Sequence, residues 1–325
     1  MNSHSTDSAG MTARARRFTL LGMRVLFTIT ATILSSGTLA AIAAAAESPQ
    51  RLPLESEFIG PGAHIAVLLP EAYTTDPNAR FRVLYVLPVE PGDERRFGDP
   101  LGVIQALGLH DTHRLICIVP EFDTTPWYGE HATDTRVRHD SHMVRAVVPF
   151  VDDRFRTLAE PEGRLLLGFS KSGSGAISLL LRHGDIFGFA ASWDAPLMFT
   201  DQQFGIWTTD EHFGTPDSMA SQMPTTLLRK HAAAFRDRPR LVITGKNKFG
   251  TISDRRFPYD GPSHTETFHA LADELGVPHA YDAGIAAPHA WHEKWMTPVM
   301  GMLLKIASRS EPEPPRSPPP GFNAQ

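Results

Sequence analysis

Cysteine is nearly absent from this sequence, because its 325 residues include a single one, Cys117. A lone cysteine excludes an internal disulfide framework, and its position in the apolar run 115–119 predicts a small buried core residue. The chain also has no large excess of charge of either sign. The formal net charge is −5 and charged residues make up 21% of the chain, so neither nucleic acid nor an anionic membrane surface is expected as a partner.

Signals for cofactors are missing as well. The chain has no glycine-rich loop of the kind that cradles phosphate groups. His289 and His292 stand close together, but no cysteine, histidine or carboxylate set completes them as a metal site. We therefore expect neither a metal nor another cofactor, and we see no internal repeat.

The two terminal segments differ in composition from the middle of the chain. Four arginines between residues 14 and 24 precede an apolar stretch that starts at Val25 and ends in alanine-rich sequence at residues 40–46. This order predicts a secretory signal peptide at residues 1–46, and hence a secreted or periplasmic protein that leaves the membrane after cleavage. An uncleaved membrane anchor is the alternative, because the apolar stretch is nearly long enough to span a bilayer. Residues 309–325 are rich in proline and poor in apolar residues, which predicts a disordered tail.

Residues 47–308 remain for one folded domain, which is long enough for a single large core. Short apolar runs alternate there with amphipathic stretches, a pattern typical of a mainly parallel central sheet flanked by helices. We expect strands at residues 64–69, 81–87, 115–119, 165–167, 187–193, 241–244 and 278–281, and helices at residues 101–107, 141–155, 270–275 and 293–307.

Residues 196–239 interrupt this alternation. Large apolar side chains stand there among polar residues, namely Phe199, Phe204, Trp207, Phe213 and Met219. This composition favours a lid of short helices inserted over an active site. A surface excursion with a small apolar cluster of its own is the alternative.

The most informative stretch is residues 163–181. A run of leucines at residues 165–167 predicts a buried strand, and apolar residues recur at helical spacing from Ala176 onward. Between them Ser170 stands at the apex of a turn, bracketed by Gly168 and Ser172. A strand, a sharp turn and a helix with a serine at the apex form the context of the G-x-S-x-G nucleophile elbow. Ser172 occupies a position where glycine is usual, and a turn without chemistry is the alternative.

Several short motifs follow one another in an order that indicates a family. They are VLLPEAY at residues 67–73, RVLYVL at 82–87, WY at 127–128, LGFSKSG at 167–173 and HAWHEKW at 289–295. With these motifs the chain resembles the putative-esterase branch of the α/β-hydrolase superfamily, which includes esterase D, feruloyl esterases and the antigen 85 mycolyltransferases. The resemblance covers about residues 60–307. It implies the α/β-hydrolase fold and a serine nucleophile that acts on esters.

Such a serine needs a base, since a neutral hydroxyl is a poor nucleophile. His289 follows the last expected strand, and the order of serine before histidine fits the order of triad members in this fold. It also matches the histidine of the family pattern G-x-H-x-W-x-x-W, with Trp291 and Trp295 in place. His292 is the rival, but we expect it to begin the final helix and to point elsewhere.

The acid of the triad is less clearly marked. The family usually places an aspartate a few residues after the penultimate strand, where this chain has Asn247 and Lys248. Asp254 is the nearest downstream carboxylate and our first choice. Asp194, at the end of the strand after the elbow helix, is the second, and Asp260 is the third. A turn or capping role is the alternative for each.

The resemblance also implies an oxyanion hole made of backbone N–H groups. The amide of Lys171, directly after the nucleophile, is the first donor. The family often has His-Gly in the loop that supplies the second donor, whereas this chain has Pro88, Val89 and Glu90. Pro88 has no N–H, so Val89 or Glu90 must donate, and Val89 is our choice. The missing glycine leaves altered or reduced activity as an alternative.

The sequence therefore predicts an exported serine esterase that hydrolyses a carboxylic ester of a sugar, a polysaccharide or a small metabolite through a Ser-His-Asp triad. Trp127 and Tyr128, together with lid aromatics, are the expected surfaces for a sugar or an aryl group. Acyl transfer to an alcohol is the alternative within the same chemistry. A catalytically silent hydrolase-like domain that binds a glycan or a partner is the alternative outside it.

Overall fold

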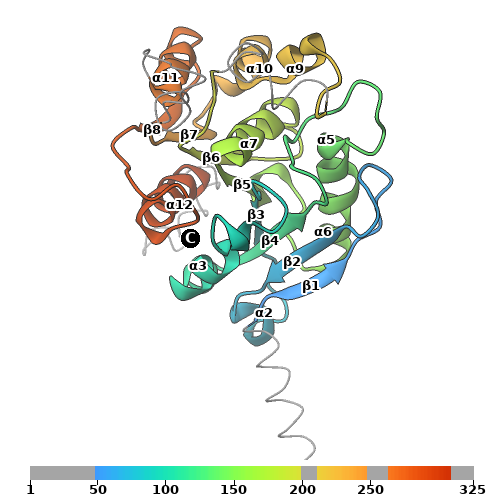
Figure 1. The fold of residues 1–325 in the computed structure, drawn as a ribbon. Coiled ribbons are helices and arrows are strands. Elements are labelled where there is room, and N and C mark those ends of the chain that lie inside the picture. Colours follow the sequence, from blue (N-terminus) through green and yellow to red (C-terminus); the bar gives the residue numbers. More distant parts are fainter. Residues whose placement is uncertain (1–47, 199–210, 247–262, 309–325) are drawn as a thin grey trace, which may run out of the picture. The chain divides into compact units, whose positions relative to one another are not determined.

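The computed structural model describes residues 48–198, 211–246 and 263–308 (Figure 1). The segments predicted as signal peptide and tail, residues 1–46 and 309–325, lie outside these ranges, as do Asp254, Asp260 and residues 199–210 of the expected lid. Within the described ranges, no helix combines the length and the apolar character needed to cross a membrane.

The described part of the chain is built on a mixed sheet of eight strands in the order β1-β2-β4-β3-β5-β6-β7-β8. The strands are β1 (Gln50–Pro53), β2 (His64–Leu68), β3 (Arg82–Val86), β4 (Leu115–Glu121), β5 (Arg164–Phe169), β6 (Phe189–Trp193), β7 (Leu241–Thr244) and β8 (His279–Asp282). β1 pairs with β2, and β2 with β4, in antiparallel register. All other neighbours in the sheet are parallel, which confirms the predicted fold class.

Most strands lie close to the predicted positions because the central strands are buried on both faces and so have nearly continuous apolar sequences. β1 was not predicted. Its four residues alternate between half-buried and exposed, and it lies at the edge of the sheet and ends in Pro53, as edge strands tolerate.

Helices cover both faces of the sheet. In β3, Val83 and Tyr85 pack into one apolar cluster, whereas Leu84 and Val86 pack into the other, because alternate residues of a strand point to opposite faces. The first face is covered by α6 (Val148–Arg154), α7 (Ser170–Arg182), α10 (Pro224–His231) and α11 (His264–Glu274). The second is covered by α3 (Pro100–Ala106), α4 (Leu109–Thr112) and α12 (Glu293–Ser308). Cys117 is fully buried in the second cluster.

The remaining helices are short. They are α2 (Ala72–Thr75), α5 (His139–His142) and α9 (Pro216–Gln222), with 3-10 turns η1 (Asp93–Arg95), η3 (Pro161–Gly163) and η4 (Ala232–Phe235). The single helix expected at residues 141–155 is continuous from α5 through a π-helical turn, η2 (Met143–Val147), into α6. Pro149 is the second residue after that turn, and proline has no N–H for the α-helical hydrogen bonds.

Candidate active site

The nucleophile elbow has the geometry that its sequence predicts. β5 ends at Phe169 and α7 begins at Ser170, whose φ of +51° is rare for a residue with a side chain. Such strain in a sharp strand-to-helix turn is typical of functional sites. Gly168 is required here, since a Cβ at this position would lie 2.3 Å from the carbonyl oxygen of Ser172.

Ser172, the departure from the usual glycine, is part of this turn. Its side chain is fully buried. The Ser172 hydroxyl donates to the carbonyl of Phe169 at 2.9 Å and accepts from the Phe169 N–H at 3.1 Å. The Ser172 hydroxyl thus binds both backbone polar groups of Phe169. Serine in place of the usual glycine therefore stabilises the turn.

The fold brings together His289 and Asp194, which stand 95 positions apart in the sequence. Nδ1 of His289 lies 2.8 Å from Oδ2 of Asp194, and a carboxylate can only accept, so Nδ1 carries the proton and Nε2 is left with its lone pair. The imidazole packs edge-on against Phe169, the residue before Ser170, with ring centroids 5.3 Å apart. The aspartate directly follows β6, and its own N–H donates to the carbonyl of Thr244 in β7 at 2.9 Å.

His292, the rival base, takes no part in this contact. His292 accepts a hydrogen bond from the N–H of Lys294 at 3.1 Å, at the start of α12, as expected for the rival. Asp254, the first choice from the sequence, and Asp260 lie outside the described residues. The carboxylate in contact with His289 is that of the second choice, Asp194.

In the loop after β3, both candidates for the second oxyanion donor already have a hydrogen-bond acceptor. The N–H of Val89 donates to Oδ2 of Asp93 at 2.9 Å, and that of Glu90 donates to Oδ1 at 2.8 Å. The indole N–H of Trp291 donates to the same carboxylate at 2.8 Å. Val89 therefore already has an anionic acceptor in this arrangement and is not an open donor.

Asp93 is a residue that the sequence did not single out. It is 4% exposed, and burial raises the pKa of its carboxyl although three hydrogen bonds lower it. The one local feature that could have drawn attention to Asp93 is its position directly after the turn at Gly92, which has a φ of +67°. Its partners Val89 and Trp291 stand far apart in the chain, so their convergence could not be predicted.

Lys171 contributes to the site through both backbone and side chain. As the second residue of α7, it carries one of the N–H groups that a helix leaves without an internal acceptor. Its ammonium lies 5.5 Å from the ring centre of Trp127, within the range of a cation–π contact. Burial lowers the pKa of Lys171 to about 8, and the charges of Glu90 and Asp93 partly oppose that shift.

The two predicted aromatic surfaces are buried. Trp127 is 6% exposed and packs with Phe213, Met219 and Met223. Tyr128 is fully buried with a φ of +56°, and its hydroxyl donates to the carbonyl of Pro88 at 2.6 Å. Tyr128 thus supports the loop that follows β3 in this arrangement, and its role as a substrate surface stays a prediction.

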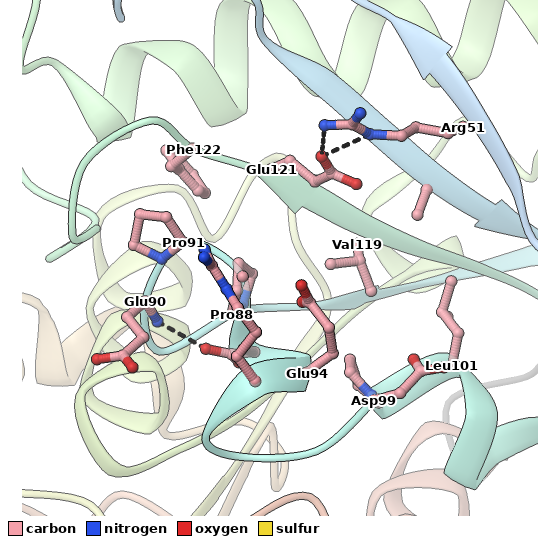
Figure 2. A pocket seen from close by; sticks show the side chains of 15 residues that line it. Arg51, Pro88, Glu90, Pro91, Glu94, Asp99, Leu101, Val119, Glu121 and Phe122 are labelled. Carbon is pink, nitrogen blue, oxygen red and sulfur yellow. Dashed lines mark hydrogen bonds and ion pairs between the residues drawn. The ribbon is translucent and has the colours of Figure 1, made fainter.

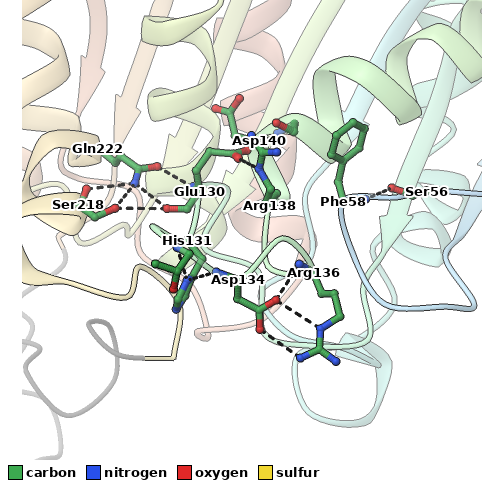
Figure 3. Close-up of polar contacts among 12 residues, drawn as sticks. Ser56, Phe58, Glu130, His131, Asp134, Arg136, Arg138, Asp140, Ser218 and Gln222 are labelled. Atoms are coloured by element: carbon green, nitrogen blue, oxygen red, sulfur yellow. Dashed lines mark hydrogen bonds and ion pairs between the residues drawn. The ribbon is translucent and has the colours of Figure 1, made fainter.

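The described part of the expected lid is fastened to the loop that carries Trp127, as Figure 3 shows. The N–H of Glu130 donates to the side-chain oxygen of Gln222 at 2.7 Å, and the Gln222 amide donates back to the Glu130 carbonyl at 2.9 Å. The carboxylate of Glu130 in turn pairs with Arg138 at 2.5 Å. α9 is therefore anchored at its C-terminal end by a two-way hydrogen bond.

A cavity of about 480 Å³ is lined in part by the loop after β3 (Figure 2). Its wall includes Glu90, Asp93, Glu94 and Glu121, and Arg51 forms an ion pair with Glu121 within it. Neither Ser170 nor His289 is among its lining residues. The cavity is thus adjacent to the loop after β3 but separate from the pair formed by His289 and Asp194.

Comparisons with known proteins show the family of this chain. Residues 56–233, more than half of the chain, match the family described as "Putative esterase". Esterase Rv1288 of Mycobacterium tuberculosis (strain ATCC 25618 / H37Rv) is 26% identical over 158 residues, which are 47% of this chain and 33% of the relative. The match thus spans about a third of that relative's length.

Solved structures share the fold. A ferulic acid esterase superposes with a TM-score of 0.61 at 16% identity, over 80% of this chain and 98% of the other. The fluorophosphonate-binding serine hydrolase FphF of Staphylococcus aureus does so with a TM-score of 0.60 at 18% identity, over the same shares. The sheet and its helices therefore form the α/β-hydrolase fold.

Proposed function

The chain belongs to the putative esterase family, and from this premise we propose that it is a serine esterase that cleaves carboxylic esters through an acyl-enzyme. The observation that carries the proposal is the 2.8 Å contact between His289 and Asp194, made beside the residue that precedes Ser170. A histidine oriented by a carboxylate next to a strained serine is the arrangement that activates a hydroxyl nucleophile.

In the proposed reaction the hydroxyl of Ser170 attacks the ester carbonyl and passes its proton to Nε2 of His289. Asp194 holds the imidazole in the tautomer that can accept this proton and stabilises the cation that forms. The N–H of Lys171 donates to the oxyanion. His289 then protonates the leaving alcohol, and a water molecule, activated by the same imidazole, releases the acid.

The substrates we propose are esters of a sugar, a polysaccharide or a small metabolite, and we propose that the protein meets them after export. The ferulic acid esterase with the same fold supports an acyl group of the aryl type. The contact of Lys171 with Trp127 places the Trp127 ring close to the residue after Ser170. We therefore propose that the acyl or alcohol group of the substrate reaches Ser170 along the Trp127 side chain. Transfer of the acyl group to an alcohol differs only in the second step, and product analysis with added alcohol separates the two reactions.

One observation favours a catalytically silent domain as the second candidate. The N–H groups of Val89 and Glu90 already donate to Asp93, so the oxyanion has one fewer open donor than the reaction requires. If this arrangement persists with substrate bound, the domain binds a ligand without turning it over.

Labelling with a fluorophosphonate probe distinguishes these candidates, because the probe reacts with an activated serine. We expect the full chain to be labelled, and we expect Ser170→Ala and His289→Ala to abolish labelling. Ser178→Ala, on the same helix, and His292→Ala, beside the base, are the matched controls and retain it. A folded wild-type protein that remains unlabelled contradicts the esterase proposal and favours the silent domain.

A further inference from the structure

Three potential metal ligands meet where α11 packs beside the edge strand β8, on elements that the proposed reaction does not use. His269 and Asp273 lie one turn apart on α11, and His279 is the first residue of β8. One nitrogen or oxygen atom from each of the three lies within 4.8 Å of the others. No metal site was expected from the sequence, in which only His289 and His292 were considered as a pair.

The tautomer of His279 is fixed by its backbone neighbour. Nδ1 of His279 lies 2.8 Å from the carbonyl oxygen of Val277, and since a carbonyl only accepts, Nδ1 must carry the proton. The lone pair of Nε2 therefore points away from Val277 and toward the cluster. Metal-binding histidines are usually oriented by such a bond from the second ring nitrogen.

His269 completes a pair of facing nitrogens. Its Nδ1 lies 2.7 Å from Nε2 of His279, so a single proton on Nδ1 joins the two rings. The ring of His269 stacks on Tyr281 with centroids 3.8 Å apart and planes at 10°, which limits its rotation. Oδ2 of Asp273 lies 3.6 Å from Nε2 of the same ring. The cluster thus offers two imidazoles and one carboxylate around a single exchangeable proton.

We propose that this cluster binds a divalent transition metal of the zinc class through Nδ1 of His269, Nε2 of His279 and the carboxylate of Asp273. The metal takes the place of the proton on Nδ1 of His269, and that proton moves to Nε2 of the same ring, so both imidazoles bind as neutral ligands with no net release of protons. Zinc–nitrogen bonds of about 2.0–2.1 Å in a tetrahedral site separate two ligands by roughly 3.3 Å. The facing nitrogens must therefore move apart by about 0.6 Å when the metal binds. Water fills the fourth position.

The metal site would stabilise the edge strand β8, which is followed by the segment that leads to His289. β8 ends at Asp282, and the chain then reaches His289 without another helix or strand. The carbonyl of Ile285 in this segment accepts a hydrogen bond from the indole of Trp193 at 3.1 Å. A metal that joins α11 to β8 adds a second attachment at the start of the segment. Its role is structural, so it stands apart from the proposed hydrolysis.

Calorimetric titration of the metal-stripped full chain with zinc chloride tests the proposal. We expect His269→Ala and His279→Ala each to bind one equivalent of zinc fewer than the wild type. His113→Ala, an exposed histidine in the turn before β4, is the control and binds as the wild type does. Asp273→Asn, which keeps the shape of the side chain, should weaken binding about 10- to 100-fold.

Two further measurements keep the test decisive. The circular dichroism spectrum shows whether each variant is folded, and if an alanine variant is not, His269→Gln and His279→Gln replace it. Cobalt substitution should give the visible absorption of a tetrahedral site in the wild type and lose it in the histidine variants. A folded wild type that takes up no zinc, or histidine variants that bind as much as the wild type, would overturn the proposal. Neither result depends on whether Ser170 reacts with the fluorophosphonate probe.

Discussion

Replacement of Asp194 by asparagine tests the central contact of the proposed site. Asp194 has a φ of +50°, a region that Asn and Asp tolerate better than other residues with side chains. Asn therefore keeps the backbone and the volume, whereas Ala would change both. The one alteration is at the atom 2.8 Å from Nδ1 of His289. There an amide can donate to the ring and select the tautomer whose Nε2 carries the proton.

The expected loss follows from how that contact is shielded. Removal of the orienting carboxylate costs about 10⁴-fold in kcat in a well-shielded triad, because the wrong tautomer cannot accept the serine proton. The Asp194 side chain is 14% exposed, whereas that of His289 is 41% exposed, so water can partly stabilise the imidazolium. We therefore expect kcat/KM to fall by about 10³- to 10⁴-fold, which corresponds to roughly 4–5.5 kcal/mol of transition-state stabilisation.

The assay is the hydrolysis of a chromogenic short-chain ester, with Asp254→Asn and Asp260→Asn measured beside Asp194→Asn. We expect these two variants to stay within about threefold of the wild type, a change of less than 1 kcal/mol. The reasoning is refuted if Asp194→Asn keeps a tenth or more of the activity while Asp254→Asn loses it. In that event the acid is the first choice from the sequence, and the contact seen with Asp194 is incidental.

Three other changes probe the supports of the site. Ser172→Gly removes the hydroxyl that binds both backbone groups of Phe169; we expect a loss of about 1 kcal/mol and a Tm lower by roughly 2–4 °C, measured by calorimetry. Lys171→Met tests the lysine pKa, which burial lowers to about 8. Because the unfolded chain binds that proton more tightly, wild-type stability should rise as the pH increases from about 8 toward the usual lysine value near 10.4, and denaturant titrations of the variant should lack this slope. Asp140→Ala removes the buried carboxylate that pairs with the partly buried Arg182, which should destabilise the protein by about 3 kcal/mol. Burial raises the pKa of Asp140, but Arg182 and His183 outweigh it and lower the pKa overall. That stabilisation should be complete above a pH of about 3.9 and be lost as the pH falls through the lowered pKa, an acid-induced loss that the variant should lack.

The position of the loop after β3 shows why some features of the site escaped prediction. The sequence indicates that Pro88 has no backbone N–H to donate and that Val89 has one, because the presence of this group depends only on the residue type. It does not indicate that Asp93 already accepts from Val89, because this bond depends on the path of the turn. It also does not show that Tyr128 turns inward to bind Pro88, 40 residues away.

The elbow was determined by the sequence itself. A buried strand, a small residue before Ser170 and a helical apolar pattern after it are encoded within fewer than twenty consecutive residues, where local sterics fix the backbone. The parallel sheet was likewise predictable, since its buried strands have nearly continuous apolar sequences.

The partners of the elbow were decided only by the tertiary structure. Asp194 meets His289 across 95 positions, and Asp93 meets Trp291 across 198. These pairs form because β6 lies between β5 and β7 in the sheet and α12 returns to the same face as α3. Strand order and helix return are properties of the whole packed chain, and no short segment contains them. For this reason the sequence pointed to Ser170 and His289 as candidates but ranked Asp194, the aspartate now found beside His289, second.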